Sequence, residues 1–409
     1  MFRKLKQVST EEKVNYLLVW GLVAVSGFPY FYSAQIFIMA LLFFSTLVFL
    51  KRSLSIDTRG LSIIGAFFLV EMLQALINKN FEPQIIAGTF MRLSVSFLIV
   101  SLCKDKFTKY YVNILYFFCI LSFIFFIPSI ISPGFFYFFL NKICPLFNPP
   151  GQNVIDYYQL QPSMILFTFD IAVLQFRNPG PFWEQGAFAI FILIAMMFNL
   201  PEEKKILTKK NIVFSLALIS TLSTSGFIAF FILLMSYYFA NETFIKKLVF
   251  IMIAFPLAFT LYYNLEFLSA KIENNIEIAG DDNTSRFGSG LSDLKDFAKS
   301  PFIGWGRGSM RFGGRKFTFF SEEQHRNNGL SSLLATYGIF IFIFYFYNYY
   351  KSFKYNCLNN SFNISFALFS LAVLFILGFS QTIFQYPFFS SIMFIHLGYR
   401  FPPNNKSVT

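Results

Sequence analysis

The sequence predicts an all-α polytopic membrane protein with about 12 transmembrane helices and a large helical extracytoplasmic loop between helices 9 and 10. Of the 409 residues, 56% are apolar, only 13% are charged and 62 are phenylalanine. Soluble domains carry about 25% charged residues. The composition therefore argues against a soluble enzyme, a coiled coil, a disordered chain and a nucleic-acid-binding domain, although the formal net charge is +12.

Apolar stretches recur along the chain, each near the roughly 20 residues that cross a hydrocarbon core of about 30 Å. They lack the strict alternation of barrel strands, so we expect helices, which satisfy their own backbone groups in lipid. The twelve expected helices cover residues 14–30, 33–50, 60–78, 84–103, 110–131, 185–200, 211–225, 227–240, 248–264, 329–350, 361–379 and 386–399.

The distribution of Lys and Arg predicts the orientation. Seven segments outside the expected helices, together 65 residues long, hold 20 of the 33 basic residues. By the positive-inside rule these segments are cytoplasmic, and both termini lie with them. The run from Val14 is expected to be the first anchor and not a signal peptide, because no small-residue cleavage site follows it. The chain then divides into helices 1–9 with an outer loop at 132–184 (residues 1–263), an extracytoplasmic cap (264–327), and helices 10–12 with a tail (328–409).

The cap holds 18 of the 54 charged residues. It contains an amphipathic stretch that Pro301 closes and whose apolar residues share one helical face: Leu291, Leu294, Phe297 and Ala298. Residues 299–326 carry six basic and two acidic side chains, so the basic half of the cap is expected to lie near the membrane and its anionic headgroups. The Gly-rich run 304–308 matches no nucleotide-binding motif and predicts a tight turn.

Arg177 and Glu184 flank a Pro-Gly-Pro turn before the helix at 185–200. A carboxylate is stabilised at a helix N-terminus, so one interpretation is capping with an Arg177–Glu184 pair that fixes the loop. The other is that Arg177 binds phosphate and Glu184 orients a hydroxyl.

Arg286 begins the amphipathic stretch of the cap. A guanidinium beside a helix N-terminus suits a phosphate, but pairing with a nearby aspartate, such as Asp281 or Asp293, is equally compatible with the sequence. Arg311 lies in the basic half of the cap.

The two histidines differ in setting. His396 lies inside the last apolar run and is expected to be a packed, hydrogen-bonded residue. His325 lies just before helix 10 on the outer side, where a neutral imidazole can serve as a general base for a hydroxyl. One such histidine with four scattered cysteines gives no zinc motif, so no metal site is predicted.

Two charges interrupt expected membrane helices, Glu71 and Arg92. Charges within a membrane are costly and mark functional sites by default. A structural Glu71–Arg92 pair is the simpler interpretation, and a cavity-facing Arg92 that contacts a lipid-linked substrate is the other. The polar run 220–226 is either a tight turn or part of a cavity wall.

Three blocks of sequence, taken together, resemble the O-antigen polymerase and ligase superfamily. RNPGPFWEQGAFA at 177–189 is similar to the family's R-x-x-G-x-F-x-E-P, TSRFGSGLSDLKDFAKSPFIGWG at 284–306 to its R…P-x-x-G-x-G, and HRNNGLSSLLATYGI at 325–339 to its HN-x-(Y/F)-L…G-I. STSG at 223–226 lies where the family often has T-x-S-R-G. The sequence departs from the pattern at Gln185, where the family has Pro, and at Gly226, where Arg is common. Asn328 matches the family's Asn, which places His325 two residues early.

The resemblance implies a membrane glycosyltransferase of the bacterial inner membrane that acts on a glycan carried by undecaprenyl pyrophosphate, with its site facing the exterior. No cofactor is implied, because pyrophosphate is already a good leaving group. The implied contacts to pyrophosphate and glycan come from Arg177, Arg286, Arg311, Arg92 and Asn328. His325 is the implied base, with Glu184 as its substitute.

The acceptor separates the functional alternatives. A repeat-unit polymerase of O-antigen or capsule transfers the glycan to the next lipid-linked unit, whereas a ligase transfers it to lipid A core. We expect the polymerase, with a chain-length regulator as a possible partner and without nucleic acid. A lipid-linked oligosaccharide flippase is the alternative from another class, but the candidate residues gather at the outer surface and not at the midplane, which favours an enzyme.

Overall fold

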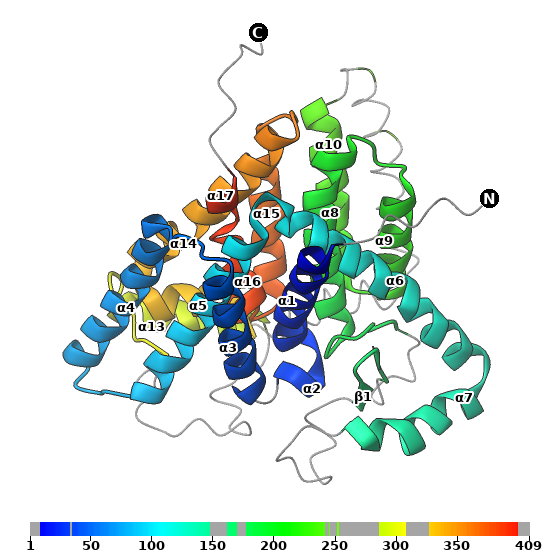
Figure 1. The fold of residues 1–409 in the computed structure, drawn as a ribbon, viewed down its shortest axis with the longest axis horizontal. Helices are drawn as coiled ribbons and strands as arrows, with labels where there is room; N and C mark the ends of the chain where they lie inside the picture. Colours follow the sequence, from blue (N-terminus) through cyan, green and yellow to red (C-terminus); the bar gives the residue numbers. More distant parts are fainter. Residues whose placement is uncertain are drawn as a thin grey trace.

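A computed structural model describes residues 9–32, 35–147, 162–169, 177–241, 286–307 and 327–399, together with residues 245 and 252. Almost all of the described residues with regular structure are helical (Figure 1). Within the described part, one antiparallel hairpin of two-residue strands joins β1 (Ser163–Met164) to β2 (Phe167–Thr168). The all-α class is confirmed.

The N-terminal helices follow one another with short connections between them. Their bounds are α1 Thr10–Gly27, α2 Pro29–Tyr32, α3 Gln35–Lys51, α4 Thr58–Ile77, α5 Pro83–Cys103, η1 Lys104–Lys106, α6 Phe107–Ile131, α7 Pro133–Phe138, η2 Phe139–Ile143 and η3 Cys144–Phe147. The later helices are α8 Gln185–Glu203, α9 Lys209–Ser220, α10 Thr224–Asn241, α13 Arg286–Lys299, α14 Gly329–Asn359, α15 Ser365–Ser380, α16 Pro387–Ile392 and α17 Ile395–Gly398.

Five helical stretches in the described residues are long and apolar enough to cross a membrane: Thr58–Ile77, Pro83–Ile131, Gln185–Glu203, Thr224–Asn241 and Gly329–Asn359. The shorter apolar helices are α3 and α15. These helices support a membrane protein. The count of twelve spans stays a prediction, and the expected helix at 248–264 lies outside the described residues apart from Met252.

One expected span is wrong as a single helix. Residues 386–399 form α16 and α17, of six and four residues, separated by Met393 and Phe394. At about 1.5 Å per residue neither reaches across a hydrocarbon core. Both are packed inside the protein, because α16 contacts α1 and α5, and α17 contacts α5 and α14.

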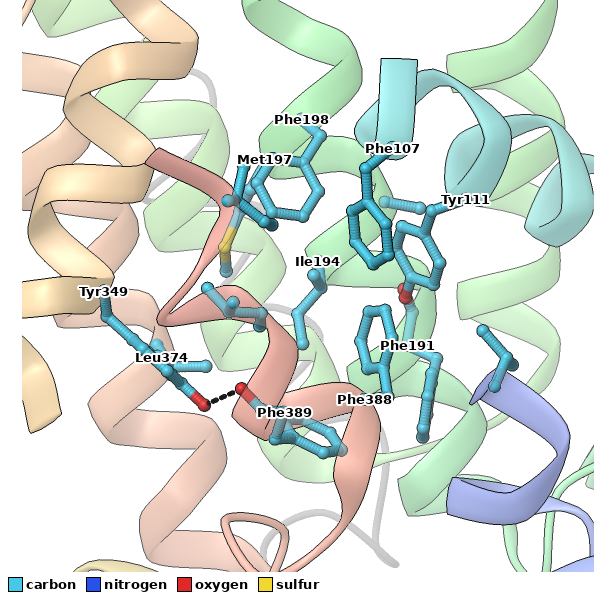
Figure 2. Close-up of a cluster of buried hydrophobic side chains, with 14 of the residues drawn as sticks. Phe107, Tyr111, Phe191, Ile194, Met197, Phe198, Tyr349, Leu374, Phe388 and Phe389 are labelled. Carbon is cyan, nitrogen blue, oxygen red and sulfur yellow. Dashed lines mark hydrogen bonds between the residues drawn. The ribbon is translucent and has the colours of Figure 1, made fainter. Parts of the chain in front are cut away.

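The centre of the bundle is α8. Its most apolar window is 89% buried, compared with 28% for α10, and it contacts α6, α9, α10 and α14. Figure 2 shows aromatic side chains packed around it, where Phe191 lies against Phe388 with ring centroids 5.1 Å apart. Tyr349 of α14 donates a hydrogen bond of 2.5 Å to the carbonyl of Phe389. Aromatic packing of this kind fixes α16 beside α8.

The two ends of the bundle differ in chemistry. At one end, ion pairs join Arg52 to Glu11 (3.4 Å) and Lys106 to Glu12 (3.3 Å). These residues come from segments that the charge distribution assigns to a common side. At the other end, the N–H of Trp183 donates to the carbonyl of Gly27 (3.2 Å), so the start of α8 meets the end of α1.

The expected amphipathic helix in the cap is confirmed as α13, but its apolar face points outward. The polar stripe is buried against α14, where Ser331 Oγ donates to Asp293 Oδ2 at 2.7 Å. Leu291 and Leu294 are 51% and 47% exposed. Phe302, just after α13, stacks on Phe340 of α14 and both are exposed. This apolar surface continues onto a membrane helix, so it is suited to contact lipid.

Candidate functional site

The loop before α8 is fixed by Asn178, which is fully buried. Its Nδ2 donates to Ser122 Oγ (2.9 Å) and Ser220 Oγ (3.0 Å), and its Oδ1 accepts from the N–H of Gly180 (3.0 Å). Arg177 therefore lies on the side of α6 and α9. The loop then reaches α1, where the N–H of Trp183, next to Glu184, donates to the carbonyl of Gly27.

Glu184 is the N-cap residue of α8, but its carboxylate does not cap the helix. Instead its Oε1 accepts a hydrogen bond from Nε2 of Gln381, in the segment after α15. Gly186 leaves room for this contact, because a Cβ there would lie 3.2 Å from Glu184 Oε1 and 3.3 Å from Gln381 Nε2. The interpretation of Glu184 as a helix-capping carboxylate is wrong.

Arg286 interacts electrostatically with Glu184 although 102 positions separate the two residues in the sequence. Burial lowers the pKa of the Arg286 guanidinium, and the attraction of Glu184 opposes this shift. An arginine whose ordinary pKa is above 12 stays protonated. The first turn of α13 thus places a cation within electrostatic range of the carboxylate at the start of α8.

Aromatic rings border Glu184. Trp183 and Tyr386 lie 5.3 Å apart between ring centroids, and Tyr32 lies 5.8 Å from Trp183 and 6.2 Å from Tyr386. Burial raises the pKa of Tyr32, and Tyr386 and Glu184 raise it further. The phenol therefore stays neutral and can donate a hydrogen bond. Aromatic faces next to a carboxylate and an arginine are suited to hold a polar ligand with apolar faces, such as a sugar.

The turn after α13 is locked against a break in α14. Gly304 and Gly306 have φ of +76° and +77°, and Gly338 in α14 has φ +72° and ψ 178°, which only glycine adopts readily. The N–H groups of Trp305 and Gly306 donate to the carbonyls of Ala335 (3.0 Å) and Thr336 (2.9 Å). The hydrogen-bonded turn covers residues 301–303 and is closed by the N–H of Gly304, so it lies just before the run 304–308 in which a tight turn was expected. The segment after it brings Arg307 into the bundle.

We expect Gly338→Ala to lower the free energy of unfolding by about 2 to 4 kcal/mol. A Cβ at this position would lie 2.3 Å from the carbonyl oxygen of Phe302, and the backbone angles would be strained as well. Thermal unfolding of the purified protein in detergent measures the effect. Gly65→Ala is the matched control: it lies in α4 with no atom within 4 Å of its Cβ and should leave Tm unchanged or slightly raised. Equal Tm values for the two variants would contradict the locked turn.

Arg307 lies in a second polar group, within the bundle. It interacts electrostatically with Glu71 and with Arg92. Glu71 accepts a hydrogen bond of 2.8 Å from Tyr337 Oη, and Arg92 donates to Thr89 Oγ1 at 3.3 Å. In the described part of the chain, Glu71 and Arg92 attract each other without forming a direct ion pair. The simple Glu71–Arg92 pair is therefore wrong, because Tyr337 and Arg307 share the space.

Tyr386 connects the two groups. Its side chain interacts electrostatically with both Glu184 and Arg307. The described polar residues thus extend from Arg286, past Glu184 and Tyr386, to Arg307 and its partners on α4 and α5.

The remaining candidates are Asn328, His325 and Arg311. Asn328 is 2% exposed and caps α14, accepting from the N–H groups of Leu330 (3.1 Å) and Ser331 (3.2 Å). Its oxygen thus has a structural role. His325 and Arg311 lie outside the described residues.

His396 and the polar run 220–226 have structural roles. His396 is buried and lies 3.4 Å from Ser352 Oγ through Nδ1, as expected for a packed histidine. The run 220–226 forms a tight turn between α9 and α10, in which Gly226 N–H donates to Ser223 Oγ at 3.3 Å.

The sequence interpretation missed the roles of Gln381, Tyr32, Tyr386 and Arg307. Gln381 breaks an apolar region, which is a weak signal of a buried polar role. Arg307 was noted only within a turn. Their partners come from distant segments, so no local pattern could have paired them.

A scan against protein-family models finds no match to the chain, and a search of curated proteins finds no similar sequence.

Proposed function

We propose that the protein is a membrane glycosyltransferase that polymerises lipid-linked oligosaccharide repeat units of O-antigen or capsule. It would transfer the growing glycan from undecaprenyl pyrophosphate to a hydroxyl of the next lipid-linked unit. The observation that carries the proposal is the electrostatic attraction between Glu184 and Arg286, from distant segments, together with the aromatic rings around Glu184 at one end of a bundle of apolar helices.

In the proposed reaction, the acceptor hydroxyl oxygen attacks the anomeric carbon, and the bond from that carbon to the pyrophosphate oxygen breaks. The hydroxyl proton goes to Glu184, or to His325 if the cap brings the imidazole to the site. Undecaprenyl pyrophosphate leaves with the bonding electrons, and Arg286 stabilises its charge. The aromatic rings would hold the sugars in position.

The proposed setting is the bacterial inner membrane, with both termini cytoplasmic and the Glu184–Arg286 group on the exterior side. This orientation is supported by the gathering of Arg52 and Lys106 at the opposite end of the bundle from Glu184. A chain-length regulator is a candidate partner.

The decisive experiment incubates purified protein with a synthetic undecaprenyl-pyrophosphate repeat unit and resolves the products by size. A ladder of polymers supports the polymerase. No ladder with the repeat unit alone, but transfer after lipid A core is added, would replace the polymerase with the ligase. No transfer to either acceptor, together with movement of the intact lipid-linked unit across a proteoliposome membrane, would favour the flippase.

A further inference from the structure

The helix α13 turns its apolar side away from the bundle. Its polar side packs on α14, where Asp293 is fully buried and accepts a hydrogen bond of 2.7 Å from Ser331 Oγ. An amphipathic helix of a soluble domain normally faces the core with its apolar side, so α13 is oriented the other way. An apolar stripe of exposed residues recurs at helical spacing along its outer side: Phe287, Leu291, Leu294 and Ala298. The described residues leave most of this apolar stripe uncovered.

Both ends of α13 lie beside the ends of apolar helices. At its start, the ring centroids of Phe287 and Phe379, in the last turn of α15, are 5.1 Å apart. After its end, Nε2 of Gln74, in the last turn of α4, donates to the carbonyl of Ile303 at 2.6 Å. The charge distribution assigns these ends of α4 and α15 to the exterior side. Helix α13 therefore extends along the outer boundary of the bundle, over about 21 Å for its 14 residues.

The apolar stripe is continuous with a surface of α14, which is long and apolar enough to cross a membrane. Phe302, after the end of α13, stacks on Phe340 with ring centroids 5.8 Å apart. Both rings are exposed, as are Ile343 and Tyr347, which follow Phe340 at helical spacing along α14. Large exposed apolar patches mark surfaces for protein or membrane contact. Because this patch runs onto a membrane helix, lipid is the covering that the observations favour for α13.

We propose that α13 is an interfacial helix embedded in the outer boundary of the membrane, with its apolar stripe among the acyl chains and its polar side on α14. Interfacial helices carry large apolar residues on one face and Lys or Arg beside it. Lys295 and Lys299 are exposed and lie along one edge of the stripe. Lysine stems can cover apolar surface there while the ammonium groups reach the headgroups. This part of the cap is thus immersed in the membrane and is not held in the water above it.

The first test locates Leu294 with a nitroxide label attached to Leu294→Cys in the full protein. The four native cysteines are buried, so the label should react with the introduced residue. In nanodiscs of phosphatidylethanolamine and phosphatidylglycerol, the label meets oxygen, which concentrates in lipid, and a polar nickel chelate, which stays in water. We expect collisions with oxygen to exceed those with the chelate several-fold. Ile343→Cys on α14 is the lipid reference, and Glu202→Cys at the exposed end of α8 is the water reference.

Two results of this test would overturn the proposal. A label at Leu294 that behaves like the label at Glu202 would place the apolar stripe in water. Low accessibility to both reagents would show that protein covers the stripe, either a second copy of this chain or another segment of the same chain.

The second test compares two leucine substitutions in the same nanodiscs. We expect Leu294→Asp to lower Tm by about 2 °C or more, because a charged side chain among acyl chains is costly. Leu207→Asp is the matched control, since Leu207 is 84% exposed in the connection between α8 and α9. It should leave Tm within about 1 °C of the wild type. If the two substitutions shift Tm equally, the apolar stripe does not lie in lipid. Neither test needs turnover, so failure of glycan transfer would refute the proposed function without affecting these results.

Discussion

Glu184→Gln is expected to reduce the rate of glycan transfer by about 10² to 10⁴-fold. The substitution keeps the shape of the side chain and an oxygen that can accept from Gln381, but it removes the negative charge that takes the proton and attracts Arg286. Because a general base acts in the transition state, kcat should fall more than KM rises. Release of undecaprenyl pyrophosphate under saturating donor measures the effect.

Glu202→Gln is the matched control, since it changes a carboxylate in the last turn of the same helix, where the side chain is exposed. It should leave the rate within about twofold of the wild type. Gln381→Met removes the hydrogen bond to Glu184 and should have a smaller effect than Glu184→Gln. If Glu184→Gln keeps near-normal activity while His325→Ala is inactive, the base is His325.

Local patterns in the sequence were enough to predict several elements. The spacing of Leu291 and Leu294 predicts α13 because helix periodicity is a property of neighbouring residues. The Gly-rich run around Gly304 predicts an irregular backbone, because positive φ favours glycine wherever it occurs, and Gly304 and Gly306 both have positive φ. The long apolar runs predict α4, α5, α6, α8, α10 and α14 for the same reason, since length and composition suffice for a membrane helix.

The direction of the α13 apolar face could not be predicted in this way. In a soluble domain Leu291 would point to the core, but a membrane offers an apolar environment outside the protein too. The polar side, with Asp293, finds its partner in Ser331 of α14. Amphipathicity alone identifies the two faces of the helix but not which of them is inside.

Contacts between segments far apart in the sequence could not be predicted from local patterns either. Glu71 and Arg92 lie on consecutive expected helices, and sequence proximity suggested an ion pair. The structure instead gives Glu71 a hydrogen bond from Tyr337, 266 positions away. The single helix predicted for residues 386–399 was wrong for a related reason. An apolar composition does not reveal the break at Met393 between two short helices.

Arg286→Ala is expected to lower kcat/KM for the lipid-linked donor by about 10² to 10³-fold, the cost of removing one charge-stabilising donor from such a site. Arg286→Lys should recover only part of this loss, because an ammonium is a point charge and cannot form the bidentate contact of a guanidinium. Both variants are compared by initial rates across donor concentrations. Equal effects of the two substitutions would indicate a structural role for Arg286, such as holding Glu184.

The lysine variant also makes a pH dependence testable. Burial lowers the pKa of a cationic group at this position, as it does for Arg286 itself. Lysine starts from an ordinary pKa of about 10.4, against more than 12 for arginine, so burial brings the proton loss of Arg286→Lys closer to the assay range. Since the cationic form binds pyrophosphate, the residual activity of Arg286→Lys should fall as the pH rises, at a pH where the wild type retains its rate. Parallel pH profiles for the two proteins would show that the charge at position 286 does not contact the donor.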